Sequence, residues 1–566
     1  TFVTPLVTAG ALALLHNSPN RVRSLLLGWC QLAVLPALVL TFLPMAEVTV
    51  YWDWVLTGAS FRMDVISRAL TLVTAVLYGV ALTAVDPRKV RRSGVLQGFL
   101  LLCFVGNIGV YAAADTVTFY LCFALMSYSA LGLVVHKRTA EARRAGIIYL
   151  VLAVLSETFS LAGLILITGA GGLELAGAPA AVAGSPHSDL IVVLVIVGFG
   201  IKAGLVPFHV WLPLAHPAAP AMASAVLSGA MVKAGLVGWL RFLPLGQDGF
   251  VDAGRVLVIV GAIGAFASIP VGLAQRNPKT ILAYSTISQL DFLTIIVGVG
   301  LAVPELAPAC ITAAVIYAVH HGLAKGAAFL AVPVWQHHAH RRRLVRVGLL
   351  IAALAIVGAP FSSGAVGKYA AKNAVEGFVV FGLDLVSLLP WVATGSTLLL
   401  IRFWWRLRAM DSEPAARPDR ELVAWLFLVV ICIPVPWILG DGWVPLAAVP
   451  GLDAVTLWDA TWPVLVGLVI AIVVWWWWPR FSGLAAPPAG DLVVVYEMGV
   501  RAAARAIGSV RARGVRPELD LMGLRERGSR VLTRLEVGVS GWSFGLGAVV
   551  VLVAAIVAGS LIGGSR

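Results

Sequence analysis

The sequence contains few charged residues, which make up only 12% of its 566 residues. A soluble globular protein carries about 25%. Hydrophobic residues make up 60% of the chain instead, and its mean hydropathy is +0.93. Apolar runs of about 18 residues or more recur along most of the chain, and each can cross the ~30 Å hydrocarbon core of a bilayer as a helix. Strands of a membrane barrel would be about 10 residues long and alternating, so the sequence predicts an all-α polytopic membrane protein.

Cysteine is scarce, and its spacing excludes most redox and metal chemistry. The five cysteines stand singly in apolar segments and form no C-x-x-C pair, which argues against a disulfide framework, an iron–sulfur cluster or a zinc site. The chain also lacks a P-loop, a dinucleotide fingerprint and a G-x-S-x-G motif. We therefore expect no cofactor, no bound metal and no catalytic centre of its own. The cysteines are Cys30, Cys103, Cys122, Cys310 and Cys432.

Positive charge exceeds negative charge, giving a formal net charge of +13. In a soluble domain this excess would suggest a nucleic-acid partner. Here the arginines lie in short loops between apolar runs, which indicates membrane topology and no nucleic acid. The first apolar segment lacks a basic n-region, so we expect no cleavable signal peptide.

We count about sixteen membrane spans, and the charge of the loops between them sets their orientation. Basic and acidic loops alternate, which by the positive-inside rule places both termini on the outer side of a bacterial inner membrane. The long unit at 344–376 is one helix interrupted at Gly358-Ala-Pro360. The approximate spans are 1–15, 24–45, 66–85, 94–113, 116–135, 146–168, 189–215, 220–241, 254–274, 281–303, 307–331, 344–376, 385–403, 422–439, 462–479 and 541–563.

The chain divides into six expected regions, five of membrane helices and one surface helix. Residues 491–536 carry nine arginines and are interrupted at Pro517, which predicts a basic amphipathic helix on the cytoplasmic surface. This helix rests either on lipid or along the flank of this subunit or a neighbouring one. The regions are 1–93 (N-terminal membrane helices), 94–243 (first repeat), 254–403 (second repeat), 422–490 (C-terminal membrane helices), 491–536 (surface helix) and 541–566 (final membrane helix).

Lys202 lies in the middle of an apolar run, shortly before Pro207. A cation at membrane depth costs several kcal/mol, so such residues usually face a polar path or a partner. A second proline-broken helix with a lysine occurs at Pro360 and Lys368. Two such helices are typical of inverted-repeat transporters, although each helix alone could be a packing kink.

Other titratable residues also fall within apolar spans. Glu157 would ionise beside a lysine, so a Glu157–Lys202 pair is a candidate switch, with a static ion pair as the alternative. His321 and Lys325 are four residues apart and share a helix face, and histidine suits a proton relay. The complete set of proton-path candidates is Glu157, Lys202, Lys233, His320, His321, Lys325 and Lys368, with Asp291 and His209 as further candidates.

Five stretches carry a family resemblance. They are Lys202-Ala-Gly-Leu-Val-Pro-Phe-His-Val-Trp-Leu-Pro, Ser224-Ala-Val-Leu-Ser-Gly-Ala-Met-Val-Lys, Pro278-Lys-Thr-Ile-Leu-Ala-Tyr-Ser, His320-His-Gly-Leu-Ala-Lys and Gly358-Ala-Pro-Phe-Ser-Ser-Gly. They resemble the seventh, eighth, tenth, eleventh and twelfth helices of the antiporter-like proton-translocating subunits. This family is shared by respiratory complex I, Mrp antiporters and energy-converting hydrogenases, including the formate-hydrogenlyase type. The resemblance covers roughly residues 60–410.

The resemblance implies two inverted five-helix repeats and a role for each buried group. Lys202 would be the switch lysine and Lys233 the connecting lysine. His320, His321 and Lys325 would form the middle relay, and Lys368 would be the exit lysine facing outside. The segment 491–536 would be a shortened lateral helix.

One departure from the family pattern concerns the switch lysine. Most members have Trp-Glu in the fifth helix, and that glutamate pairs with the lysine, whereas this sequence has Phe123-Ala124 there. Glu157, one helix later, matches a second acidic position found in several members and is expected to take over the pairing.

These observations predict a proton-translocating subunit, or a cation/proton antiporter, within a larger complex that supplies the energy. The expected partners are lipid, protons and other subunits, which form a redox or hydrogenase-like arm. One alternative is coupling to a soluble zinc protein for inorganic-carbon uptake. Another is a non-conducting membrane anchor, which Ala124 favours.

Overall fold

The computed structural model describes residues 1–15, 20–43, 49–52, 58–86, 90–412, 420–443, 449–481, 488–490 and 492. This part of the chain is mostly helical, and 13 of its helices are long and apolar enough to cross a membrane. Its strands form two antiparallel hairpins and no closed sheet. The predicted class of helical multi-pass membrane protein is therefore confirmed. The expected surface helix at 491–536, apart from Leu492, and the span at 541–563 lie outside the described residues.

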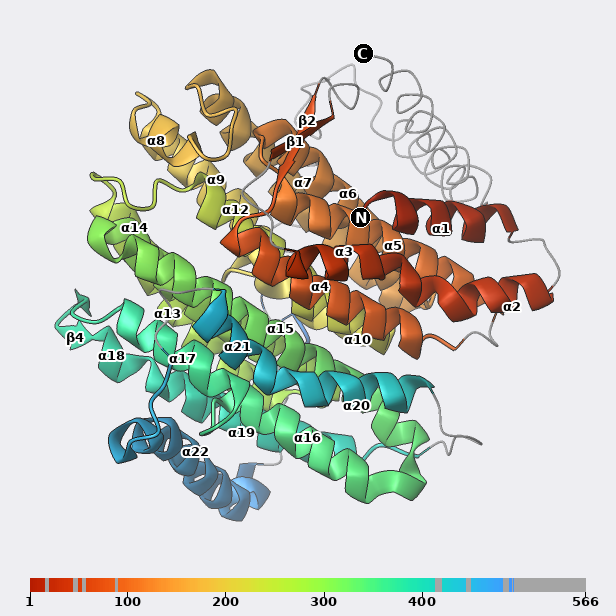
Figure 1. The fold of residues 1–566 in the computed structure, drawn as a ribbon. Helices are drawn as coiled ribbons and strands as arrows, with labels where there is room; N and C mark the ends of the chain where they lie inside the picture. The colour runs from red at the N-terminus through yellow and green to blue at the C-terminus, as the bar shows by residue number, and fades with distance from the viewer. Residues whose placement is uncertain are drawn as a thin grey trace, which may run out of the picture.

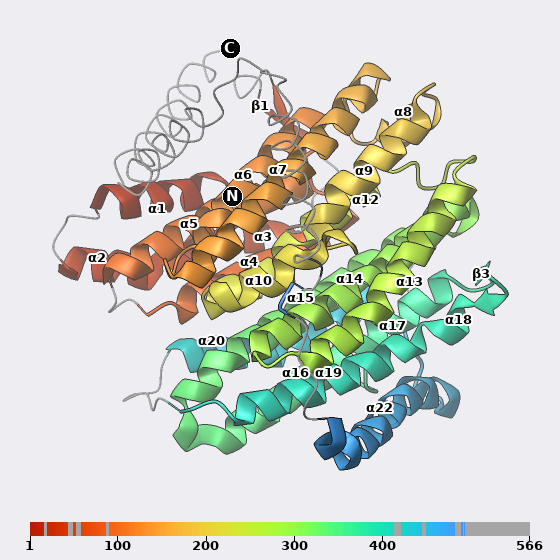
Figure 2. The ribbon, with the colours of Figure 1, turned by 180° about the vertical axis from the view of Figure 1, so that it is seen from behind.

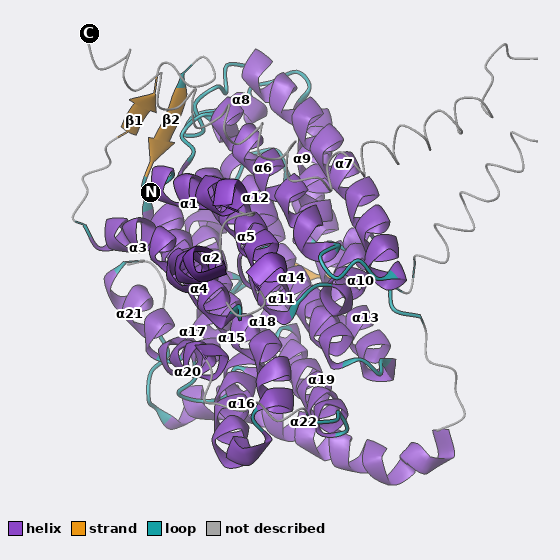
Figure 3. Ribbon diagram, turned by 90° about the vertical axis from the view of Figure 1, so that its right-hand side faces the viewer, coloured by secondary structure: helices purple, strands orange, loops and turns teal. Residues whose placement is uncertain are grey.

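The N-terminal region contains short helices that lie against α5 and a hairpin at one end of the bundle (Figure 3). Helix α1 has 12 residues, about 18 Å at 1.5 Å per residue, so it is shorter than the span expected over 1–15. Helix α4 begins with a capping box in which the Asp64 side chain accepts from the Ser67 amide. The elements are α1 Val3–Leu14, α2 Asn20–Trp29, α3 Leu35–Phe42, β1 Thr49–Trp52, β2 Ala59–Arg62, α4 Val65–Ala84 and α5 Val90–Ala112.

The first half of the helical body runs from α6 to α12 and contains the first broken helix. Helix α9 ends at Ala203 and is capped by Gly204, whose φ of +84° is left-handed, and the chain resumes as α10. A π-helical turn, Leu227–Met231, separates α11 from α12. The elements are α6 Thr116–Val134, α7 Ala140–Gly169, α8 Ala178–Ala183, α9 Ser188–Ala203, α10 Trp211–Ala218, α11 Ala221–Val226 and α12 Lys233–Phe242.

The second half runs from α13 to α19 and contains the second broken helix. Helix α16 ends at Val357 and is capped by Gly358, which has a φ of +80°, and α17 begins at Ser363. The unit expected over 344–376 is thus two helices. The elements are α13 Val251–Ala274, α14 Pro278–Ala302, α15 Ala307–His337, α16 Arg342–Val357, α17 Ser363–Ala374, β3 Val379–Val380, β4 Leu383–Asp384, α18 Leu385–Leu388 and α19 Pro390–Arg408.

Helices α14 and α15 form the centre of the molecule (Figure 1). All residues of α14 are buried, and α15 packs against α4, α11, α14, α16, α17 and α20. The first half lies on one side of them and the second half on the other, with α22 at the edge against α19 (Figures 1 and 2). The remaining helices are α20 Arg420–Cys432, α21 Pro434–Gly442 and α22 Ala454–Phe481, the last starting earlier than the expected 462.

Candidate functional site

The predicted path residues are distributed over five helices, α7, α9, α12, α15 and α17. Six of the seven are no more than 4% exposed, and only Lys368 is half-buried. Charged and imidazole side chains are rarely buried this fully without a polar partner. The buried six are Glu157, Lys202, Lys233, His320, His321 and Lys325.

Lys202 lies in the last turn of α9, immediately before the break. Its Nζ donates to Ser127 Oγ and to Tyr149 OH, each at 3.1 Å. The Tyr149 hydroxyl in turn donates to the Ser127 carbonyl at 2.8 Å. The C-terminal end of a helix dipole also favours a cation. Neighbouring helices thus hold this ammonium by hydroxyl groups.

Glu157 lies on α7, which packs against α9, but it does not form the direct ion pair considered from the sequence. Among the described residues, no carboxylate oxygen lies within 4.0 Å of the Lys202 ammonium. Neither Glu157 oxygen has a hydrogen-bond partner among the described residues. Glu157 and Lys202 both approach Ser127 and interact electrostatically across it. The two charges are therefore neighbours separated by a hydroxyl.

The Phe123-Ala124 pair, which replaces the Trp-Glu of most family members, lies on α6 beside Lys202. Phe123 on α6 is fully buried, and its ring centroid lies 5.9 Å from the Lys202 Nζ. Ala124 is half-buried on the same helix. An aromatic face therefore stands on α6 near the lysine, and the nearby carboxylate comes from α7.

Lys233 and His321 make a direct contact between two predicted path residues. Lys233 Nζ lies 2.6 Å from His321 Nδ1 and 2.6 Å from the Ser228 carbonyl. Ser228 belongs to the π-helical turn before α12, where the wider winding alters the backbone hydrogen bonding. Turns of this kind are frequent at functional sites.

The other α15 residues point to different neighbours. Lys325 Nζ donates to Ser285 Oγ on α14 at 2.6 Å. His320 Nδ1 lies 3.0 Å from Ser363 Oγ, at the start of α17. Helix α15 thus connects the α12 lysine, the α14 hydroxyl and the second broken helix, each through a hydrogen bond.

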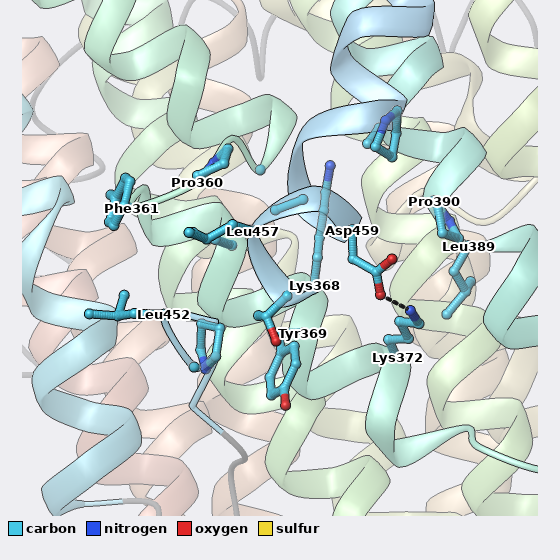
Figure 4. Close-up of a pocket in the computed structure, with 18 of the residues that line it drawn as sticks. Pro360, Phe361, Lys368, Tyr369, Lys372, Leu389, Pro390, Leu452, Leu457 and Asp459 are labelled. Atoms are coloured by element: carbon cyan, nitrogen blue, oxygen red, sulfur yellow. Dashed lines mark hydrogen bonds and ion pairs between the residues drawn. The ribbon is translucent and has the colours of Figure 1, made fainter. Parts of the chain in front are cut away.

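Lys368 lies on α17 after the second break, and its Nζ donates to the Val357 carbonyl at the end of α16. Its side chain passes over Gly358, where an added Cβ would lie 2.6 Å from the lysine Cδ. One face of this region borders a pocket of ≈ 80 Å³ (Figure 4). Lys368 is therefore the path candidate that borders an open space.

Asp291 and His209 lie away from these contacts. Asp291 on α14 is fully buried, and neither carboxyl oxygen has a hydrogen-bond partner among the described residues. The carboxyl lies against Gly264 of α13, where an added Cβ would lie 2.1 Å from Oδ2. His209 is buried within the break after α9, its ring 6.4 Å from that of Tyr284.

The sequence reading missed several polar groups. His216 on α10 is fully buried against Phe329, with ring centroids 4.4 Å apart. Lys372 on α17 pairs with Asp459 on α22. The hydroxyl partners carried no signal because serine and tyrosine are common in apolar helices. They are Ser127, Tyr149, Ser285 and Ser363.

The chain is similar in sequence to known membrane proteins. Residues 113–375 match the family described as "NADH:quinone oxidoreductase/Mrp antiporter, TM". Hydrogenase-4 component B of Escherichia coli strain K12 is 27% identical over 66% of this chain and 62% of its own length. NADH-quinone oxidoreductase subunit N of Paraburkholderia phymatum is 33% identical over 41% of this chain and 50% of its own length. The matched stretch thus spans less than two thirds of either relative.

Two solved structures share the fold. A chain of the Mrp complex from Dietzia sp. DQ12-45-1b superposes with a TM-score of 0.72 and 20% identity, covering 95% of this chain and 63% of that one. A chain of the archaeal membrane-bound sulfane sulfur reductase superposes with a TM-score of 0.67 and 19% identity, covering 94% and 99%. The likeness to these structures establishes the architecture.

Proposed function

Because residues 113–375 belong to the antiporter-like transmembrane family of NADH:quinone oxidoreductases and Mrp antiporters, we propose that this chain is a proton-translocating membrane subunit of a larger energy-coupling complex. The observation that carries the proposal is the hydrogen bond between Lys233 and His321. Both side chains are no more than 1% exposed, in a region where burying an unpaired charge is costly.

The Lys233–His321 contact can hold a proton on either side. A charged Lys233 donates to the neutral Nδ1 of His321, and a protonated His321 donates to the neutral amine of Lys233. At 2.6 Å, transfer between the two nitrogens needs no large movement of either side chain. This pair is the central proton-carrying site of the proposed path.

The proton-carrying groups before and after this pair are lysines that donate hydrogen bonds to hydroxyl or carbonyl groups. Lys202 would act as the switch beside the first break, and Lys325 would continue the relay along α15. His320 would connect the relay to Ser363 and so to the second broken helix. Lys368 would release the proton outside. Water bridges would join proton-carrying groups that do not touch, as is usual between polar groups more than 3.5 Å apart.

Glu157 would take over the role of the missing fifth-helix carboxylate. It is 4% exposed and shares the Ser127 neighbourhood with Lys202. A proton arriving at Glu157 would remove the negative charge that favours the Lys202 ammonium. The hydroxyl of Ser127 would transmit this change while keeping the two groups apart.

The finer architecture is part of the same proposal. Helices α9 and α16 each contain 16 residues and each is capped by a left-handed glycine, which supports two inverted repeats at 94–243 and 254–403. We retain sixteen spans, both termini outside, and a lateral helix at 491–536 as the arrangement that fits these repeats.

The partners would be subunits of a redox or hydrogenase-like complex, as the names of the relatives suggest. Coupling to a soluble zinc protein remains an alternative partner arrangement. Identification of the subunits that purify with the chain decides between them: iron–sulfur proteins support the first and a large zinc protein the second.

Two observations favour a non-conducting membrane anchor: α6 carries Ala124, and no carboxylate of the described residues contacts Lys202 directly. Changing Lys202 to Ala in the complete complex tests both functions. We expect loss of coupled proton translocation, while the other subunits still purify with the chain. The matched control is Asp189→Asn, which removes an exposed charge from the same helix. Full translocation by the Lys202→Ala variant would support the anchor.

A further inference from the structure

A pocket separates α17 from α22 on the side of the second broken helix (Figure 4). Its walls include Lys368, Lys372 and Asp459. Its volume of ≈ 80 Å³ is room for several water molecules. The pocket therefore adjoins the proposed exit lysine directly.

The backbone at the break forms part of this wall. Gly358, Pro360 and Phe361 line the pocket, and Phe361 has a left-handed φ of +62°. Non-helical backbone at membrane depth persists only where protein buries it or where it faces a water-filled cavity. Gly358, Ala359 and Ser362 are buried, whereas the Phe361 side chain is 62% exposed, so protein encloses the break only in part. Together with the charged side chains in the lining, this opening favours water in the pocket.

An ion pair bridges the two walls. Lys372 Nζ donates to Asp459 Oδ2 at 2.5 Å, and the two side chains are 29% and 41% exposed. Helix α22 otherwise packs against α19, where Thr394 Oγ1 donates to the Pro463 carbonyl at 2.8 Å. The Lys372–Asp459 contact thus ties the α17 wall to a helix that is anchored elsewhere.

The Lys372–Asp459 ion pair lies close to Lys368 along α17. The two lysines are four residues apart on α17 and therefore lie on one face, where like charges repel. Asp459 balances the Lys372 charge and holds that ammonium toward α22 (Figure 4). Loss of the pair would free the Lys372 side chain and allow the α17 wall to move relative to α22.

We infer that this pocket is a water chamber connecting Lys368 with the outer aqueous phase, and that the Lys372–Asp459 ion pair is the gate that holds its walls together. The use of the chamber for proton exit rests on the proposed function. The existence and the gating of the chamber do not, so the two can be tested apart.

Thiol labelling of the complete complex in membrane vesicles tests the chamber. Leu457 lines the pocket on α22, and Val469 on the same helix is 60% exposed but lies outside it. We expect a membrane-impermeant methanethiosulfonate to label Leu457→Cys from the outer side and to leave Val469→Cys, in lipid, unlabelled. The parent chain with its five native cysteines gives the background. Absence of labelling at Leu457→Cys, or labelling only from the inner side, overturns the chamber.

The gate is tested by removing each charge in the Leu457→Cys chain. We expect Lys372→Gln and Asp459→Asn each to speed labelling by about two- to fivefold, as expected for breaking one partly exposed ion pair. Asp459→Glu should restore the slow rate, and Glu376→Gln, an exposed carboxylate just after α17, should not change it. Simple attraction of a charged reagent would move the two variants in opposite directions. That result, or unchanged rates in both, overturns the gate.

The outcomes separate the two proposals. If Lys202→Ala leaves translocation intact while Leu457→Cys is labelled from outside, the proton function fails and the chamber stands. If Lys202→Ala abolishes translocation and Leu457→Cys stays unlabelled, only the chamber fails.

Discussion

Lys233 Nζ and His321 Nδ1 lie 2.6 Å apart between two helices that are far apart in sequence, and neither side chain is more than 1% exposed. Lys233 Nζ and His321 Nδ1 can share a hydrogen bond only if at least one of the two side chains is neutral. The contact therefore limits the pair to at most one excess proton. A second proton would bring two cations together in a buried site.

Lys233→Arg tests whether this pair exchanges its proton. Arginine keeps the positive charge and the donors but does not deprotonate in proteins. We expect proton translocation by the purified complex in proteoliposomes to fall by about 10²-fold, the usual contribution of a proton-transfer group. Co-purification of the other subunits checks assembly. Near-normal translocation by an assembled Lys233→Arg complex would show that the charge alone suffices.

Glu157 is predicted to substitute for the carboxylate missing at Ala124. Glu157→Gln keeps the shape of the side chain but removes its charge, so we expect slower translocation with intact assembly. Adding Ala124→Glu to this variant should recover part of the rate, because it returns a carboxylate to the α6 position. The rate is measured in proteoliposomes for the single and double variants. If Glu157→Gln is as fast as the parent, another group must balance Lys202.

The ion pair between Asp64 and Arg241 predicts a pH-dependent stability. Arg241 Nη2 donates to Asp64 Oδ1 at 2.9 Å, and the carboxylate also caps α4. Burial raises the pKa of Asp64, but Arg241 and the Ser67 hydrogen bonds outweigh it and lower the pKa to about 2 from 3.8. The stabilisation, about 2 kcal/mol, is therefore fully present above about pH 4 and disappears as the pH falls towards 2.

Asp64→Asn measures this contribution, since asparagine still caps the helix. We expect a lower Tm for the detergent-solubilised complex near neutral pH, and a difference from the parent that shrinks as the medium is acidified below about pH 4. Asp252→Asn, which removes an exposed carboxylate from the first turn of α13, is the control and should change Tm little. A Tm difference that stays constant with pH would contradict the assignment.

Hydropathy and loop charge were sufficient to predict the helical membrane class and the approximate positions of most helices. Two spans depart from their expected limits. The span expected over 1–15 is longer than α1, which has only 12 residues. The span expected from 462 begins at Ala454, because the Asp459 carboxylate pairs with Lys372 and is accommodated within α22.

The sequence identified the buried ionisable residues but not the hydroxyl groups that contact them. A lysine such as Lys202 is visible in sequence because its burial is costly. Ser127 is not, because a hydroxyl passes unnoticed in an apolar helix. The separation of Glu157 from Lys202 depends on how α6, α7 and α9 pack, which no single-helix pattern contains.

Asp291 and Gly264 supply the last prediction. The three heavy atoms nearest to a Cβ built at Gly264 all belong to the Asp291 carboxyl group, with Oδ2 at 2.1 Å. Gly264→Ala should therefore destabilise the complex, by about 1–3 kcal/mol as is typical of overpacking. Asp291→Ala in the same chain should relieve the clash, so the double variant should recover the Tm lost by Gly264→Ala.

The same residues decide whether Asp291 belongs to the proton path. Asp291→Asn keeps the volume of the side chain but cannot bind a proton as a carboxylate does. If Asp291 is a proton-carrying site, translocation falls while Tm stays near that of the parent. If translocation is unchanged, Asp291 is a neutral packing group, and the space left by Gly264 serves only to admit its side chain. A clash relieved in the double variant, together with unchanged translocation in Asp291→Asn, would remove Asp291 from the path and leave the Lys233–His321 pair as its centre.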